Sequence, residues 1–187
     1  RIRSLFGIFG INEIDYLVSV IVSIITIVVL INSFNLIDGI DGLAGSYSVI
    51  CSAIFGLSYY RLGEYNYPLV VLSVVIIGAV LAFLNYNLSN YRITKIFMGD
   101  TGSMLLGFLL AFTSICFINI FIDKGLPNVP SYHLKSAPVI AVAILILPIV
   151  DTLNVICIRI WNKKSPFDAD KNHIHHKLLK LDLTHRR

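Results

Sequence analysis

Long runs of residues without charge alternate along this chain with short polar segments. The uncharged or nearly uncharged runs cover residues 16–37, 43–60, 65–91, 101–122 and 136–160. A run of about 20 apolar residues is long enough to cross the hydrocarbon core of a bilayer as a helix. We therefore predict five transmembrane helices, at approximately residues 16–34, 43–60, 67–86, 103–122 and 137–160. A polar, basic tail at 161–187 follows the last of them.

The composition agrees with a membrane location. Hydrophobic residues make up 56% of the chain and charged residues 14%, whereas soluble domains carry about 25% charged residues. The sequence has no internal repeat. We predict an all-α integral membrane protein in which residues 1–187 form a single membrane domain. Because the chain opens on Arg1 in a polar loop, we expect it to be part of a longer polypeptide.

Five spans alternate the connecting segments between the two sides of the membrane. One side receives the stretch 32–45, the loop 85–102 and the tail. That side carries ten of the 15 Lys and Arg residues, namely Arg92, Lys95, Arg159, Lys163, Lys164, Lys171, Lys177, Lys180, Arg186 and Arg187. Since basic residues favour the cytoplasmic side, we expect a bacterial inner-membrane protein whose polar motifs face the cytoplasm.

The first of these motifs gathers two amides and two carboxylates between two apolar runs. Asn32, Asn35, Asp38 and Asp41 are each three residues apart, so all four can lie on one broad face of a helix end. The neighbouring glycines permit positive φ angles and a close approach to the backbone. Carboxylate and amide oxygens suit a hard cation such as Mg²⁺, or a nucleotide. The alternative is a plain helix end followed by a glycine-rich turn.

A second motif, FMGDTGS at residues 97–103, opens the fourth span. Gly99 and Gly102 free the backbone there, and the N-terminus of the following helix favours phosphate. Asp100 at this position either holds a cation or caps the helix, a role that Ser103 could also take.

The fifth span carries an acid and ends on a base. Asp151 lies within the apolar run, where ionised groups are costly and usually functional, so it either orients a ligand or pairs with Asn154 or another buried group. Arg159 either anchors the span at the membrane surface or binds phosphate.

Three histidines in four residues, His173, His175 and His176, stand in the tail among lysines. They form a site suited to anionic oxygen. The alternatives are a zinc site, which would need a ligand from elsewhere, and a solvated tail with histidines present by chance.

Taken together, the motifs resemble one family. They read NxxNxxDGxDGLAG, FMGDxGS, PxxD before a basic end, and SPF followed by HIHH. In this order they resemble the polyprenyl-phosphate N-acetylhexosamine-1-phosphate transferases (glycosyltransferase family 4). The HxHH form is similar to the branch that uses N-acetylglucosamine, whereas the phospho-N-acetylmuramoyl-pentapeptide branch has consecutive histidines.

The resemblance implies an enzyme that transfers a sugar-1-phosphate, N-acetylglucosamine-1-phosphate in this branch, from a UDP-sugar to undecaprenyl or another polyprenyl phosphate and releases UMP. It implies Mg²⁺ as cofactor, with Mn²⁺ as an alternative. The expected partners are the UDP-sugar, the lipid phosphate and the membrane. A homodimer remains open, and no nucleic acid is expected.

The resemblance also assigns roles to individual residues. Asp100 resembles the main Mg²⁺ ligand and Asn35 a second ligand, Phe97 resembles a ring that stacks on uracil, and Arg159 resembles a diphosphate contact. The expected catalytic residues are Asp38, Asp41, Asp100, His173, His175 and His176. The expected substrate-binding residues are Asn32, Asn35, Phe97, Gly99, Asp151 and Arg159.

Two features depart from the family pattern. The upstream DDxxD run is absent from this chain, so we expect the catalytic base to lie outside it. The loop Asn85–Lys95 lacks the usual proline, which leaves the family's nucleotide-contacting asparagine unplaced. Rival interpretations are the pentapeptide branch, a secondary transporter and an inactive assembly subunit. Against a transporter, the motifs gather at one surface and no repeat is seen.

Overall fold

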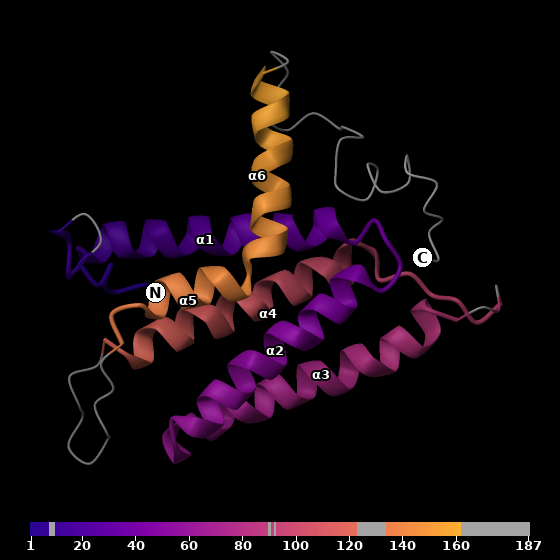
Figure 1. Ribbon diagram of the computed structural model, residues 1–187, viewed down its shortest axis with the longest axis horizontal. Coiled ribbons are helices and arrows are strands. Elements are labelled where there is room, and N and C mark those ends of the chain that lie inside the picture. The colour runs from indigo at the N-terminus through magenta and orange to yellow at the C-terminus, as the bar shows by residue number, and fades with distance from the viewer. Residues whose placement is uncertain (8–9, 90, 92, 123–133, 162–187) are drawn as a thin grey trace.

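The computed structural model describes residues 1–7, 10–89, 91, 93–122 and 134–161 of the chain. The helices in this part are α1 (Tyr16–Ile37), α2 (Leu43–Arg61), the 3₁₀ turn η2 (Glu64–Asn66), α3 (Tyr67–Asn87), α4 (Gly99–Ile120), α5 (Ala137–Ile144) and α6 (Ile146–Trp161). The four long helices lie against one another in the spatial order α1, α4, α2, α3 (Figure 1). Each is long and apolar enough to cross a membrane. The predicted all-α, multi-pass membrane fold is therefore confirmed.

The helix ends differ from the predicted ends where polar motifs begin. α1 continues three residues past the predicted end at 34, and α4 begins at Gly99 rather than at 103. Hydropathy alone marks only the apolar part of each helix, whereas the backbone continues to form helical hydrogen bonds into the polar motif. The earlier start of α4 places Asp100 inside its first turn.

The fifth predicted span is broken. The sequence predicts one helix over 137–160, but α5 and α6 meet at an angle of 75°, and in Figure 1 α6 passes α1 and projects away from the other long helices. Pro148 lacks the N–H that would bond the carbonyl of Ile144 in a continuous helix. That carbonyl instead accepts from the hydroxyl of Tyr47 at 2.8 Å and faces the thiol of Cys51 at 3.2 Å. α2 therefore satisfies the backbone group that the proline frees.

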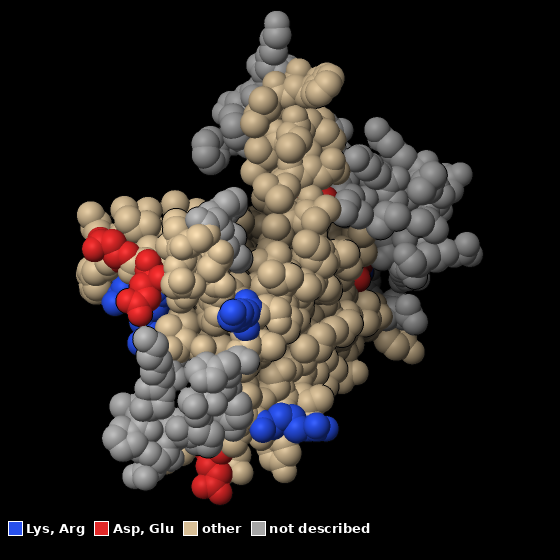
Figure 2. Space-filling model, turned by 60° about the vertical axis from the view of Figure 1, so that its left-hand side comes forward, with Lys and Arg blue, Asp and Glu red and all other residues tan. Residues whose placement is uncertain are grey.

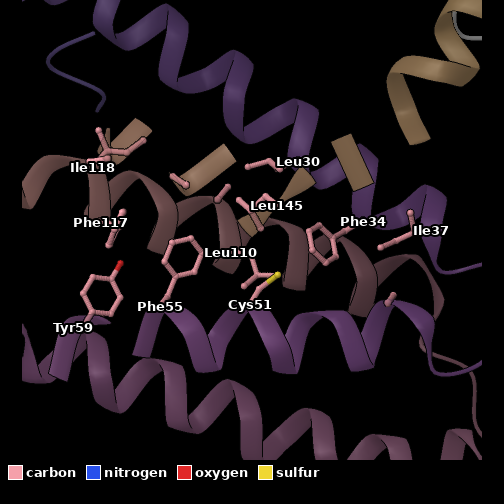
Figure 3. Close-up of a cluster of buried hydrophobic side chains, with 14 residues drawn as sticks. Leu30, Phe34, Ile37, Cys51, Phe55, Tyr59, Leu110, Phe117, Ile118 and Leu145 are labelled. Atoms are coloured by element: carbon pink, nitrogen blue, oxygen red, sulfur yellow. The ribbon is translucent and has the colours of Figure 1, made fainter. Parts of the chain in front are cut away.

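The core between α1, α2 and α4 is aromatic at one end of the bundle. Phe55 and Phe117 pack with ring centroids 5.7 Å apart, and both neighbour the fully buried Tyr59. The Tyr59 hydroxyl donates to the carbonyl of Thr113 on α4. Figure 3 shows these side chains pointing between the helices. The hydroxyl is thus satisfied inside an apolar layer that joins α2 to α4.

A glycine sets the distance between α1 and α4. A Cβ at Gly107 would lie 2.8 Å from the Cα of Ile31 and 2.9 Å from the carbonyl oxygen of Leu30. Only glycine allows this approach without a shift of one helix. The close crossing brings the C-terminal end of α1 beside the N-terminal end of α4. The outer surfaces of these helices are apolar, and most of the face in Figure 2 carries neither acids nor bases.

Candidate active site at one end of the bundle

The two amide- and acid-bearing motifs meet where α1 ends and α4 begins. The side-chain amide of Asn35 donates to Oδ1 of Asp100 at 3.0 Å and to Oγ of Ser103 at 3.2 Å. Asn35 and Asp100 are 65 residues apart in the chain. The structure therefore brings together the two residues that the sequence analysis proposed as metal ligands.

The turn between α1 and α2 carries the other two carboxylates. α1 ends at Ile37, so Asp38 and Asp41 lie in the turn rather than on a helical face. The turn closes at Gly42, whose φ is +78°, while Gly39 and Gly45 have no positive φ. The spacing predicted that one helical face would gather the four polar residues, but Asp38 and Asp41 lie in the turn, where Asp38 interacts electrostatically with Asp100 and Asp41.

Asn32 takes no part in this cluster. Its side-chain amide donates to the carbonyl of Val28 at 2.7 Å, one turn back on its own helix. This hydrogen bond stays within α1 and joins Asn32 to none of the other polar residues of the motif.

The acids repel one another. Burial, the negative charge of Asp100 and that of Asp41, in this order of size, together raise the pKa of Asp38 to about 6. A carboxyl whose pKa is raised in this way holds its proton more strongly than an exposed one. A cation placed among these groups would relieve the repulsion.

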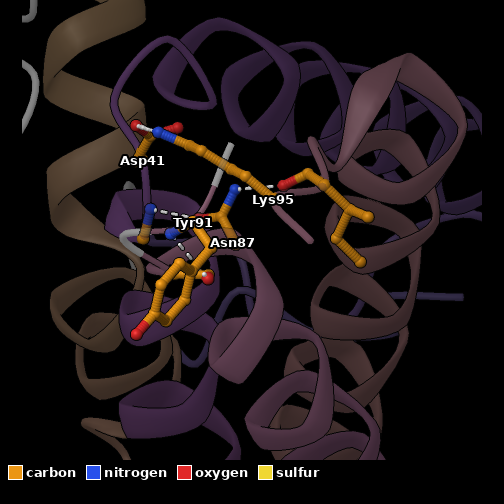
Figure 4. Close-up of polar contacts among 7 residues, drawn as sticks. Asp41, Asn87, Tyr91 and Lys95 are labelled. Atoms are coloured by element: carbon orange, nitrogen blue, oxygen red, sulfur yellow. Dashed lines mark hydrogen bonds and ion pairs between the residues drawn. The ribbon is translucent and has the colours of Figure 1, made fainter. Parts of the chain in front are cut away.

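A cleft of about 260 Å³ opens beside the acids. It is lined by Asp38, Gly39, Asp41, Lys95 and Phe97. Lys95 forms an ion pair with Asp41 (Figure 4), and its Nζ lies 5.5 Å from the centroid of the Phe97 ring. The ring itself is 75% exposed, so one of its faces remains accessible to a planar group.

Asp100 is not the N-cap of α4. The N-cap position is held by Met98, and no side chain caps the helix there. Asp100 lies in the first turn and is exposed, where a negative charge interacts favourably with the helix dipole. Gly99 precedes it with a φ of +66°. The carboxylate is therefore accessible to solvent and does not cap the helix.

The donor set fits Mg²⁺ if the substrate supplies oxygens. Among the described residues, no three His, Cys, Asp or Glu side chains lie close enough to hold a metal ion together. Mg²⁺ usually takes one or two carboxylates and completes its shell with water and phosphate oxygens. Asp100 with Asn35 meets that requirement. As a ligand, Asn35 would turn its amide oxygen to the cation, and the contact with Asp100 would be replaced.

The remaining predicted site residues either lie away from the cleft or belong to parts of the chain that the structure does not describe. Asp151 is 1% exposed on α6. Like Asn35 and Asp100, it is not among the residues that line the cleft. The hydroxyl of its neighbour Thr152 donates to Oγ of Ser33 on α1 at 2.9 Å. The side chain of Arg159 and the whole histidine motif, His173, His175 and His176, lie outside the described residues.

Two polar residues beside the cleft were given no role in the site by the sequence pattern. Lys95 was expected only as a basic loop residue, and Asn87 lies in the loop Asn85–Lys95, in which the family's nucleotide-contacting asparagine was left unplaced. Both act through contacts with the turn 38–42, 45 or more residues away in the chain. No local pattern reveals such partners. The only available signal was the single lysine just before FMGD.

Comparison with known proteins identifies the family. Residues 1–118 match glycosyl transferase family 4. The chain is 39% identical over 121 residues to a decaprenyl-phosphate N-acetylglucosaminephosphotransferase of Mycolicibacterium smegmatis, covering 65% of this chain and 29% of that protein.

Two further relatives are undecaprenyl-phosphate alpha-N-acetylglucosaminyl 1-phosphate transferases. That of Haemophilus influenzae is 33% identical over 147 residues, covering 76% of this chain and 37% of the relative. That of Escherichia coli is 31% identical over 143 residues, covering 76% and 35%.

The chain belongs to glycosyl transferase family 4, which confirms the family inferred from the motifs. The matched residues 1–118 include Asn35, Asp38, Asp41 and Asp100. The chain spans about a third of the length of the relatives named above.

Proposed function

We propose that the complete protein containing this chain transfers N-acetylglucosamine-1-phosphate from a UDP-sugar to a polyprenyl phosphate. The named relatives are phosphotransferases for N-acetylglucosamine with decaprenyl or undecaprenyl phosphate. The observation that carries the proposal is the contact between Asn35 and Asp100 at 3.0 Å. It joins the two family motifs into one acidic site at the end of an apolar bundle.

In the proposed reaction an oxygen of the lipid phosphate bonds to the sugar-linked phosphorus of the UDP-sugar. The bond between that phosphorus and the bridging oxygen breaks, and UMP leaves with the electron pair. Two anionic phosphates must approach one another, so the site must offset their repulsion. Mg²⁺ held by Asp100 and Asn35 would supply this neutralisation and polarise the phosphorus.

The residues of the chain hold the substrates around that point. The exposed ring of Phe97 offers a stacking surface for uracil at the mouth of the cleft. Lys95 supplies a positive charge within the described cleft. Asp38 and Asp41 line the cleft from the opposite loop and keep anions from binding there without a cation. Arg159 and the histidine motif are proposed to stabilise the departing charge.

The position of the site explains how a lipid could reach it. Two exposed apolar side chains, Leu88 and the fully exposed Ile93, lie in the connection between α3 and α4 that carries Lys95. We propose that the site faces the cytoplasm at the inner-membrane surface, where a nucleotide sugar and a lipid phosphate can meet.

A radiolabelled substrate tests the function. Membranes containing the complete protein are incubated with labelled UDP-N-acetylglucosamine, polyprenyl phosphate and Mg²⁺. The proposal predicts a labelled lipid that carries the sugar through a diphosphate, together with released UMP. Uptake of the label into vesicles without a lipid product would favour a transporter instead. The absence of both uptake and lipid product would favour an inactive assembly subunit.

A further inference from the structure

Three successive residues near the end of α1 contact three different helices. Ser33 accepts a hydrogen bond from the hydroxyl of Thr152 on α6 at 2.9 Å. The ring of Phe34 packs against the ring of Tyr47 on α2, with centroids 6.3 Å apart. Asn35 bonds to the N-terminal end of α4. The turn of α1 that presents the proposed metal ligand is therefore held by α6 and α2 as well as by α4.

The contact with α6 belongs to a chain of hydrogen bonds inside the bundle. Ser33 and Thr152 are both buried. The Ser33 hydroxyl donates to the carbonyl of Val29 at 2.7 Å, so its oxygen is left to accept from Thr152. In such surroundings hydrogen bonds strengthen one another, and a lost partner is costly to replace. The two hydroxyls therefore fix α1 and α6 relative to each other at this level.

The beginning of α6 is held by a second polar contact. The hydroxyl of Tyr47 donates to the carbonyl of Ile144 at 2.8 Å and accepts from the backbone N–H of Leu147 at 3.3 Å. Because the ring of Tyr47 also packs against Phe34, the same end of α1 lies against both fastening points of α6. A shift of α6 along α1 would disrupt both contacts.

We propose that Ser33 and Thr152 form a positioning pair for the acidic site. Residues two apart on a helix point to nearly opposite sides, so Ser33 holds the turn from behind while Asn35 faces α4. The inference rests on the proposed function, because the pair acts through Asn35. Displacement of a reacting group by about 1 Å can lower a rate by about 10²-fold. Loss of the pair should therefore act mainly on the rate of the chemical step.

The surroundings of the pair argue against a direct contact with substrate. Neither hydroxyl is among the groups that line the cleft, and both side chains lie between α1 and α6 with almost no exposed surface. A substrate could reach Ser33 only after α6 had moved away. The pair therefore influences the reaction through the position of α1.

Kinetics on the complete protein test this role. We compare Thr152→Val with Thr113→Val, since both remove a buried threonine hydroxyl but that of Thr113 donates to Leu110 on its own helix. For Thr152→Val we expect kcat to fall about tenfold, the effect of one lost hydrogen bond on a barrier. The Mg²⁺ concentration for half-maximal rate should rise, and the KM for UDP-N-acetylglucosamine should stay unchanged. The control should keep all three values.

Two kinetic outcomes would overturn the proposal. A lower melting temperature with an unchanged kcat would mean that the bond serves the fold alone. A raised KM with an unchanged kcat would indicate a substrate contact instead.

Further variants test whether the two residues act together. Thr152→Ser keeps the donor and should retain most of the rate. The double variant Ser33→Ala/Thr152→Val should have the same kcat as Thr152→Val, because both changes remove one shared bond. Losses that multiply would overturn the pairing. If Thr152→Val does not fold, Ser33→Ala carries the test, with Ser48→Ala as control, because the buried Ser48 hydroxyl donates only to Ala44 on its own helix.

A disulfide provides a readout that needs no activity. In a complete protein whose native cysteines have been replaced, Ser33→Cys/Thr152→Cys should form a disulfide on mild oxidation. Thr26→Cys/Thr152→Cys should not, because position 26 lies about 10 Å farther back along α1. Disulfide formation in a protein whose wild type shows no transfer would refute the proposed function and keep the contact between α1 and α6. Failure of the first pair to cross-link would refute the contact, whatever the activity.

Discussion

At the scale of single residues, Asp38 shows how neighbouring acids raise the pKa of a carboxyl group and lower its contribution to stability at neutral pH. It lies just past the end of α1, partly buried, with two other carboxylates near it. Its pKa of about 6 lies above the ordinary value of 3.8, so the folded state binds its proton more tightly than the unfolded state. Stability contributed by this group is therefore greatest at low pH and declines as the pH rises through about 6.

Asp38→Asn should abolish this dependence. In Mg²⁺-free detergent solution, the variant should melt at a higher temperature than the wild type at pH 7.5, because it lacks the buried and repelled charge. The difference should shrink steadily between about pH 6 and pH 4. Thermal unfolding of the complete protein across this range is the measurement. A variant that melts at a lower temperature at pH 7.5 would show that the ionised carboxylate stabilises the fold.

The residues of the site were only partly predictable. Asn35, Asp38, Asp41 and Asp100 stand out because amides and acids are rare beside apolar runs, and the structure brings them together. Asn32 shares their spacing, yet its amide bonds to its own helix. The contacts of Asn87 with the backbone of Gly42 and Ile96 could not be predicted, because Gly42 is 45 residues away in the chain. Sequence shows which side chains are chemically unusual but not which backbone groups they meet.

At the scale of helices, small residues decide which ends come together. Gly107 lets α1 and α4 approach so closely that a Cβ would lie 2.8 Å from a backbone atom. Small residues at such crossings are common in membrane helices, where packing drives association. The contact between Asn35 and Asp100 lies toward the end of the same helix pair. The geometry of the acidic site therefore depends on a glycine about two turns beyond Asp100 on α4.

Gly107→Ala should push α1 and α4 apart and weaken both the fold and the site. We expect a lower melting temperature and reduced transfer. Gly78→Ala is the matched control, because no atom lies within 4 Å of a Cβ at Gly78. Alanine is the better helix former by about 1 kcal/mol, so the control should be neutral or slightly stabilised. Equal behaviour of the two variants in melting and transfer assays would show that the close crossing does not matter.

Helix positions were more predictable than helix continuity. Hydropathy placed all four long helices because each has an uninterrupted apolar run. Hydropathy could not show the break between α5 and α6. A proline such as Pro148 fits a single kinked span as well as two separate helices. The bend is stabilised by Tyr47 from α2, which bonds to the freed carbonyl of Ile144. The local pattern shows the proline but not the contact with α2 that stabilises the break.

At the scale of the whole molecule, the polar motifs in the described residues lie at one end of an apolar bundle. The turn 38–42 and the loop that leads into α4 meet there, while η2 lies at the other end (Figure 1). The excess of basic residues on the motif side predicts that this end faces the cytoplasm.

Cysteine labelling in intact bacterial cells tests the orientation. In a complete protein whose native cysteines have been replaced, Ile93→Cys should be protected from a membrane-impermeant thiol reagent, since Ile93 lies in the loop before α4. Glu64→Cys, exposed in η2, should be labelled. Permeabilised cells should label both. Labelling of Ile93→Cys from outside would reverse the assigned orientation.

The central claim is that Asp100 anchors Mg²⁺ for transfer of the sugar phosphate. The measurement is the transfer rate of the complete protein against Mg²⁺ concentration, for the wild type and Asp100→Asn. Asp15→Asn at the opposite end of α1 is the control, since asparagine caps a helix as well as aspartate does. Asp100→Asn should still fold, lose at least about 10²-fold in rate, and need more Mg²⁺. Near-normal transfer with an unchanged Mg²⁺ requirement would contradict the account.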